Sequence, residues 1–301
     1  MNTLIALPHI QKTNAHQFFS YATYPLLWSG LVCALWAGVQ YPDHLGTIAA
    51  VKGGVIFLVC LALELIYPIH KHWGITWSLL ARRDLPMVAT NGAFAVLLNY
   101  ALVFLAIGTA SESAGVMSGQ PLWLQIVAGL LVFEVLQYSI HRCMHVENGP
   151  VSRFFWHVHA IHHLPQQLYL VMHTVFHPVN YVIIRIGVQL LPIWVLGFDA
   201  MAVFIYGSVI ALNGTVSHLN FDLRLGWMNY IFVGPELHRY HHSAKSAEAV
   251  NYGAALSLFD LLLGTFRYTP GQHPEQLGLT EEDGYPGQKS PVQALLFPFR
   301  G

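Results

Sequence analysis

HRCMH (141–145), HAIHH (159–163) and HRYHH (238–242) are the three short stretches around which this chain is organised. Each spaces its histidines three or four positions apart, and on a helix such positions share one face. Neutral imidazole is a common protein ligand of Zn, Cu, Fe and Ni. The three motifs hold more imidazoles than one ion takes, so they predict a site for a pair of metal ions. The histidines concerned are His141, His145, His159, His162, His163, His238, His241 and His242.

The composition indicates that the rest of the chain is a membrane scaffold. Of its 301 residues, 54% are hydrophobic and 10% are charged, whereas soluble domains carry about a quarter charged residues. A net charge of −1 gives no electrostatic reason to expect nucleic acid as a partner. The three cysteines form no CxxC pair, which argues against disulfides and against a cysteine zinc site. We therefore expect an integral membrane protein.

Apolar stretches recur along the chain, and a membrane-spanning helix needs about 20 such residues. The last two stretches are separated by a very short link, which predicts a helical hairpin. We expect an all-α, polytopic bundle of about six crossings, with a cytoplasmic helical cap that carries the dimetal site. The stretches are residues 24–40, 48–67, 86–108, 121–140, 181–197 and 199–217.

The connecting segments differ in their content of basic residues. Residues 41–47, 109–120 and 197–199 contain no Lys or Arg, and these residue types concentrate in cytoplasmic loops. The asymmetry predicts that both termini and all three histidine motifs lie on the cytoplasmic side. The membrane would be the inner membrane in a bacterium, or an ER-like membrane in a eukaryote.

Three further histidines lie near the motifs. His218 stands alone at the end of the last crossing, on the face where the motifs are expected to converge, and we interpret it as a further ligand. His173 and His177 repeat the four-residue spacing of HRCMH, but Pro178 biases His177 away from helical geometry. The sequence leaves His177 open between a metal ligand and a residue that supports one, and it favours His173 less.

These motifs and their surroundings resemble the fatty acid hydroxylase / sterol desaturase superfamily of integral-membrane, histidine-box diiron oxidases. The resemblance covers about residues 125–268. It rests on HRCMH, FFWHVHAIHHLP, FHPVN, the isolated His218 and the run PELHRYHHSAKSAEAVNYGAALSLFDLLLGTFRY. It implies N-terminal transmembrane helices in residues 1–120, the catalytic domain in 121–268 and a cytoplasmic tail in 269–301. The tail is rich in Gly, Pro and charge, so we expect it to be loosely ordered.

The resemblance also implies a reaction and its cofactor. It implies two Fe ions (Fe2+/Fe3+) and O2-dependent hydroxylation or desaturation of a lipid, either sterol-like or fatty acyl, held between the helices. Zn is expected as a substitute in purified material. The implied iron ligands are all histidines: His141, His145, His159, His162, His163, His218, His238, His241 and His242.

Three other side chains are candidates for additional roles around the metals. Asn213 lies beside a position where some members of the family carry an extra histidine. Carboxylates often accept the N–H of metal-bound imidazoles. Glu134, which precedes HRCMH by one heptad on the same helical face, and Glu236, beside His238, are candidates for that role.

The sequence contains neither a GxGxxG motif nor a CxxC pair, so we expect a separate electron donor, a cytochrome b5-like protein or a ferredoxin. Two other classes are alternatives: a membrane b-type cytochrome and a histidine-rich metal transporter. A haem would use two histidines and leave the triplets unused, and transport sites usually lie at bilayer depth among acids. The sequence does not separate hydroxylation from desaturation.

Overall fold

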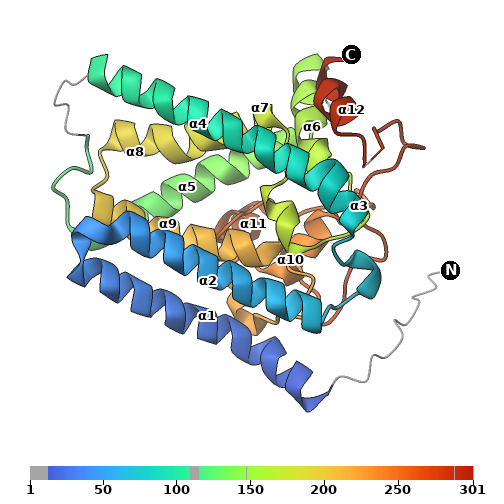
Figure 1. Ribbon diagram of the computed structural model, residues 1–301, viewed down its shortest axis with the longest axis horizontal. Helices are drawn as coiled ribbons and strands as arrows, with labels where there is room; N and C mark the ends of the chain where they lie inside the picture. Colours follow the sequence, from blue (N-terminus) through green and yellow to red (C-terminus); the bar gives the residue numbers. More distant parts are fainter. Residues whose placement is uncertain (1–12, 109–114, 147, 288, 301) are drawn as a thin grey trace.

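The computed structural model describes residues 13–108, 115–146, 148–287 and 289–300 (Figure 1). Within these ranges the regular elements are all helices. Isolated β-bridges pair residues in the segments between them. Long helices run side by side through most of the molecule, and shorter ones gather at one end. The predicted all-α fold class is confirmed.

Five segments in the described ranges are long and apolar enough to cross a membrane, which indicates an integral membrane protein. Each has 18 residues or more, a length of at least about 27 Å in an α-helix. They are α1 (Asn14–Gln40), Pro42–Ile66 with η1 (Pro42–His44) and α2 (Leu45–Ile66), α5 (Leu122–Met144), Pro178–Leu196 and α9 (Ala200–Ser217).

The third expected crossing coincides with α4 (Leu85–Gly108). The side chains of residues 99 and 101–108 and the link at residues 109–114 lie outside the described part of the chain. The count of about six crossings and the cytoplasmic orientation therefore stay predictions.

The segment Pro178–Leu196 is not a uniform α-helix. It consists of α7 (Pro178–Val182), a π-helical stretch η5 (Ile183–Leu190) and α8 (Leu191–Leu196). Gly197 ends it in the left-handed region at φ 69°, which glycine adopts without steric penalty. The chain then turns directly into α9, as the expected hairpin requires.

α9 is the most enclosed of these five segments: half of its span is buried, against 17–28% for the other four. Glycines on its neighbours allow this close packing. A Cβ at Gly38 of α1 would overlap the ring of Phe204, and one at Gly129 of α5 would overlap the ring of Tyr206. Small residues let membrane helices approach closely, so α1 and α5 hold α9 in place between them.

The shorter elements form a cap at one end of the long helices, and this cap carries the histidines of HAIHH and HRYHH. It includes α6 (Pro150–His163), η4 (Leu170–Thr174), η6 (Gly226–Tyr230), α10 (Pro235–His241) and α11 (Leu258–Leu263). The remaining short elements are η2 (Lys71–Trp73), α3 (Trp77–Leu79), η3 (Leu80–Asp84), α12 (Pro291–Leu296) and η7 (Phe297–Phe299).

The expectation of a loosely ordered tail is wrong. Ala294 of α12 is buried in one cluster with Met87 of α4 and Ile161 of α6, and Leu295 and Phe297 pack against it. The Nε1 of Trp156 also donates a 2.8 Å hydrogen bond to the hydroxyl of Tyr285. A few apolar side chains thus fasten the tail, although its average composition is that of a flexible segment.

Candidate metal centre

Four helices end at the same place, and each brings histidines at its C-terminus. His141 lies in the last turn of α5 and His145 follows as its C-cap, while His163 is the last residue of α6. His218 is the C-cap of α9 and His242 is the C-cap of α10. The C-terminus of a helix carries a partial negative charge that favours cations, typically by about 0.3–1 kcal/mol. The converging helix ends therefore favour the binding of a cation between the imidazoles.

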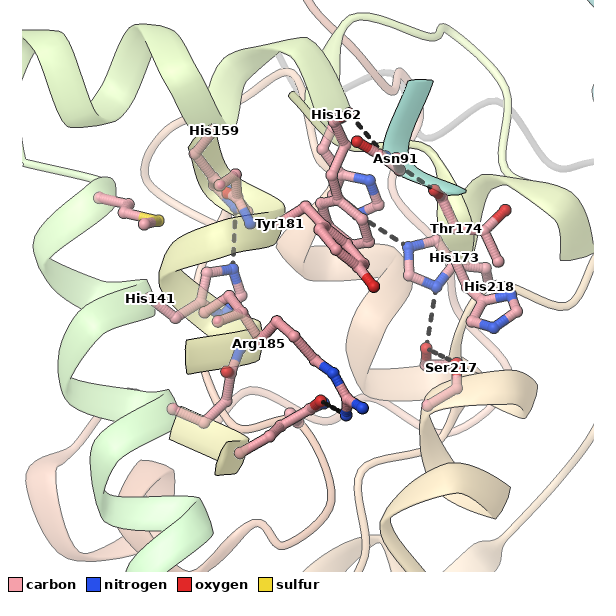
Figure 2. Close-up of a pocket in the computed structure, with 18 of the residues that line it drawn as sticks. Asn91, His141, His159, His162, His173, Thr174, Tyr181, Arg185, Ser217 and His218 are labelled. Carbon is pink, nitrogen blue, oxygen red and sulfur yellow. Dashed lines mark hydrogen bonds between the residues drawn. The ribbon is translucent and has the colours of Figure 1, made fainter. Parts of the chain in front are cut away.

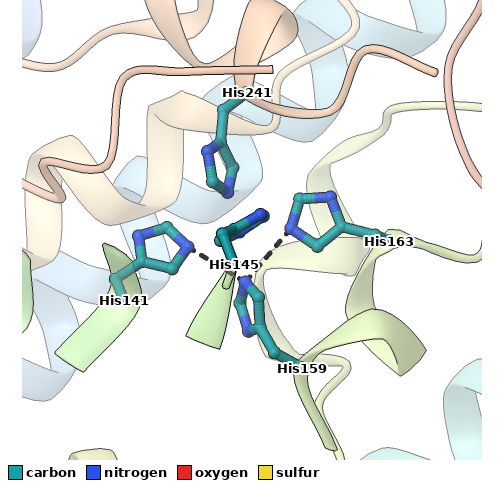
Figure 3. Close-up of side chains that lie close together, drawn as sticks. All are labelled: His141, His145, His159, His163 and His241. Atoms are coloured by element: carbon teal, nitrogen blue, oxygen red, sulfur yellow. Dashed lines mark hydrogen bonds between the residues drawn. The ribbon is translucent and has the colours of Figure 1, made fainter. Parts of the chain in front are cut away.

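The structure brings all nine predicted histidines together, in two groups whose ring nitrogens lie within 4.8 Å of one another. Figure 3 shows the first group. The two groups are in contact, because the ring of His163 in the first stacks on the ring of His242 in the second, with centroids 4.3 Å apart. The histidines of one motif do not all face one way, because each triplet contributes to both groups. The first group is His141, His145, His159, His163 and His241; the second is His162, His218, His238 and His242.

Hydrogen bonds fix the ring orientation in the first group. The Nδ1 of His141 lies 2.8 Å from the carbonyl oxygen of Tyr252, and the Nδ1 of His159 lies 2.9 Å from Oδ1 of Asn180. Because both partners are acceptors, both Nδ1 atoms carry the proton and both Nε2 atoms carry a lone pair. These two Nε2 atoms are only 2.9 Å apart.

The second group repeats this arrangement. The Nδ1 of His162 donates to the carbonyl of Val175 at 3.0 Å. The Nδ1 of His218 lies 2.9 Å from the hydroxyl of Ser217, which already donates its own hydrogen to Gly214. The Nε2 atoms of His162 and His218 therefore also face each other with lone pairs, at 3.0 Å. Two buried acceptors at this distance repel each other unless a cation lies between them, so the donor set fits a metal ion in each group.

Further contacts between Nε2 atoms link the rings within each group. Five such contacts measure 2.9–3.1 Å. The two nitrogens of each contact are thus close enough to bind one metal ion together.

Burial keeps these imidazoles in the neutral form that binds metals. Desolvation lowers the pKa of His162 to about 3, because a charged ring is disfavoured away from water. The same cause lowers the pKa well below its ordinary value in the other histidines of the cap and in His218: His145, His159, His163, His218, His238, His241 and His242.

The sequence suggested that Glu134 accepts the N–H of an imidazole. In the structure its carboxylate instead holds a loop. Its carboxylate accepts the backbone N–H groups of Ala254, Ala255 and Leu256 at 2.8–3.0 Å. The same loop contains Tyr252, whose carbonyl orients His141. Glu134 thus supports the metal centre through the backbone.

Asp260 also anchors this loop. Its carboxylate accepts the N–H groups of Tyr252 and Gly253, each at 2.8 Å. The partners that orient the rings are thus an amide, a hydroxyl and backbone carbonyls. Sequence reasoning missed Asn180, although it lies within the FHPVN stretch, because nothing local pairs it with His159.

Glu236 and Asn213 are also structural in their contacts. Glu236 accepts the N–H of Leu225 at 2.8 Å and the Nδ2 of Asn229 at 2.7 Å. Asn213 accepts the hydroxyl of Tyr24 at 2.7 Å and donates through Nδ2 to a carbonyl of its own helix. Asn213 therefore ties α1 to α9, and its amide is already occupied by these two partners.

His177 and His173 lie outside both groups. His177 is the N-cap of α7: its Nδ1 accepts the N–H of Val179, and its Nε2 donates to the carbonyl of Leu295, both at 3.1 Å. Both of its ring nitrogens are therefore engaged. His173 donates to the carbonyl of Leu170 at 3.1 Å and borders the cavity described next.

A cavity of about 500 Å3 opens beside the metal centre, between α4, α5, α9 and the segment Pro178–Leu196 (Figure 2). It is bordered by histidines of both groups, namely His141, His159, His162, His218 and His238. A second cavity, of about 240 Å3, is bordered by the other four. The nine imidazoles thus stand between two cavities, and the larger one reaches into the membrane helices.

Comparison with known proteins agrees with this architecture. Residues 126–265 match the fatty acid hydroxylase family. The ornithine lipid hydroxylase OlsE of Rhizobium tropici is 29% identical over 270 residues, which cover 85% of this chain and 78% of the relative. No solved structure matches the chain.

The match of residues 126–265 and the similarity to OlsE support a place in the fatty acid hydroxylase superfamily. They indicate that the chain is an enzyme of the oxidoreductase class.

Proposed function

We propose that this protein binds two irons at its nine clustered histidines and hydroxylates a lipid with O2. The observation that carries the proposal is the pair of facing lone-pair contacts, His141–His159 and His162–His218, at the border of a cavity of about 500 Å3. The family match and the similarity to a lipid hydroxylase support the same conclusion. In this proposal residues 121–268 carry catalysis, on the cytoplasmic side of the membrane.

Iron bound at the two groups supplies the redox chemistry that activates O2 for cleavage of a C–H bond. The residues of the chain keep the site ready for this. The Tyr252 carbonyl, Asn180 and the Val175 carbonyl hold three rings with their Nε2 atoms facing inward. The apolar helices around the cavity hold the lipid and exclude bulk water, which keeps the imidazoles neutral.

We propose hydroxylation rather than desaturation, because the relative OlsE is a hydroxylase. The balanced reaction converts R–H, O2, two electrons and two protons into R–OH and water. The electrons come from a separate donor, a cytochrome b5-like protein or a ferredoxin. A lipid with an amino-acid head group is the first substrate class to test, since OlsE is named for ornithine lipid.

The b-type cytochrome alternative fits the geometry poorly. A haem iron holds its two axial imidazoles on opposite faces of a flat macrocycle, at twice the metal–nitrogen distance. The Nε2 atoms here lie 2.9–3.1 Å apart, which leaves no room for that plane. A metal transporter would need a path past the buried imidazoles, and the cavities described on either side are separated by them.

The test combines metal and lipid analysis. The chain is expressed in a host that makes amino-acid lipids, and lipid extracts are compared by mass spectrometry with those of cells carrying His159→Ala or His218→Ala. We expect a gain of one oxygen with the wild type, none with these variants, and two irons per wild-type chain. His44→Ala, at an exposed position in η1, is the matched control and should behave as wild type.

Loss of two hydrogens from the lipid would instead identify a desaturase. Iron-loaded protein that changes no lipid in the presence of a reductase system would refute the proposed activity. A Soret band in the absorption spectrum of the purified protein would support the b-type cytochrome alternative.

A further inference from the structure

The cavity beside the metal centre contains one charged side chain for which the proposed chemistry has no use. Arg185 is the only Lys, Arg, Asp or Glu among the described residues that border it. Figure 2 shows Arg185 extending into the space that is also faced by Tyr181, His141 and His159. The cation and the metal centre therefore share one chamber.

Within the part of the chain that the structure describes, Arg185 has a single hydrogen-bond partner, and this partner is neutral. Its Nη1 donates to Oε1 of Gln189 at 2.8 Å, and no carboxylate in the described ranges forms an ion pair with it. A guanidinium has five N–H groups in a planar fork. Most of this donor capacity is directed at the cavity and is not used by the protein.

The position of Arg185 makes a guanidinium without an anionic partner unusual. It lies in Pro178–Leu196, one of the segments apolar enough to span a membrane, where an ionisable side chain is costly and commonly functional. The surrounding backbone is the π-helical stretch Ile183–Leu190, and π-helical turns in α-helices occur frequently at functional sites. A cation kept at such a position calls for an anionic partner.

The location also fits the head of an amphiphile. Arg185 and Gln189 border a further cavity of about 260 Å3, whose other lining side chains include Phe133, Val188 and Ile210. The guanidinium therefore stands where two cavities with mainly apolar walls meet. An amphiphile bound there can place its charged group on Arg185 and its apolar chain along these walls.

We propose that Arg185 binds an oxyanion of the lipid substrate, a carboxylate or a phosphate, and that Gln189 holds the guanidinium fork in position. Guanidinium binds both groups through two parallel hydrogen bonds, and one cation in a chamber without acids matches a monoanion. The inference rests on the proposed function for the statement that this ligand is the substrate. Binding itself needs no turnover.

Binding by the full-length, iron-loaded protein in a neutral detergent tests the proposal. The probes are sodium oleate for a carboxylate, phosphatidylglycerol for a phosphate and monoolein for an uncharged lipid, titrated by native mass spectrometry. Wild-type protein should bind at least one anionic probe on the order of 10-fold more tightly than monoolein, as expected for charge-assisted hydrogen bonds. The anion preferred distinguishes carboxylate from phosphate.

Arg185→Met should lose this preference, and Arg185→Lys should keep only part of it. Arg153→Met, at an exposed position of α6, is the matched control and should keep it in full. Unchanged iron content in Arg185→Met shows that the metal centre has folded.

Equal binding of monoolein and both anions by wild-type protein would overturn the proposal, and this comparison needs no variant. So would an unchanged anion preference in Arg185→Met. Anion selectivity that depends on Arg185, without any lipid oxidation, would refute the proposed activity and leave the anion site in place.

Discussion

Replacing Asn180 with Leu should weaken one of the two metal sites and leave the other intact. Asn180 is 3% exposed, and its Oδ1 accepts the proton on Nδ1 of His159 at 2.9 Å. Leucine has the same branched shape and the same number of side-chain heavy atoms, and it cannot accept a hydrogen bond. The ring of His159 must then either bury an unpaired N–H or move the proton to Nε2, which is the atom that faces His141 and His163.

Either outcome carries a penalty that can be bounded. A buried donor without an acceptor costs about 1–3 kcal/mol, which is about 5- to 150-fold in a binding constant. Loss of a group that orients a metal ligand typically lowers affinity about 10- to 100-fold. We therefore expect a loss of one to two orders of magnitude at the group that contains His159.

The assay is removal of iron from purified protein by a graded series of chelator concentrations, with bound metal counted by mass spectrometry. Wild-type protein should release two ions over a narrow range, whereas Asn180→Leu should release one ion early. Asn180→Asp keeps the acceptor and adds a negative charge, so it should hold both ions at least as well as wild type.

Asn91→Leu is the matched control, because Asn91 is a buried amide of the same cavity whose Nδ2 bonds the carbonyl of Phe176 and no imidazole. If Asn180→Leu kept both ions with wild-type affinity, the assignment of lone pairs at His141 and His159 would be wrong.

Three further predictions concern the loop, the pH dependence and the cavity. Glu134→Leu leaves three backbone N–H groups without their acceptor, so thermal unfolding in detergent should show a destabilisation of roughly 3 kcal/mol; Glu134→Gln, which keeps one acceptor oxygen, should lose less. Burial lowers the pKa of His162 from 6.5 to about 3, so between these values the unfolded chain binds a proton that the folded chain excludes, and stability is lost as pH falls. The Tm of metal-free protein should therefore fall below pH 6.5 and be flat just above it, and His162→Gln should show a shallower fall; a Tm that rises with acidification would contradict this. Gly214 borders the large cavity, and a Cβ there meets nothing within 4 Å, so Gly214→Leu should cut lipid turnover by about 10-fold or more through occlusion while iron content stays at the wild-type level; unchanged turnover would place the lipid elsewhere.

Local patterns in the sequence were enough to predict the fold class and the histidines that meet. Runs of apolar residues specify membrane helices because every backbone polar group must be satisfied within the segment. A spacing of four places two imidazoles on one side of a helix without reference to any other part of the chain, and the pairs His141–His145, His159–His163 and His238–His242 each lie in one group. For the same reason the tail was misjudged: its composition is that of a loose segment, but Ala294 finds partners on α4 and α6 that are far away in sequence.

The division of the histidines into two groups was decided only by the tertiary structure. His162 and His163 are adjacent in sequence yet belong to different groups, as do His241 and His242. Successive helical residues point about 100° apart, so which group each ring joins depends on how α5, α6, α9 and α10 are oriented against one another. The acceptors that fix the rings, such as Asn180 and the Tyr252 carbonyl, and the chamber that joins Arg185 to the metal centre, likewise arise from contacts between distant segments, which no local spacing encodes.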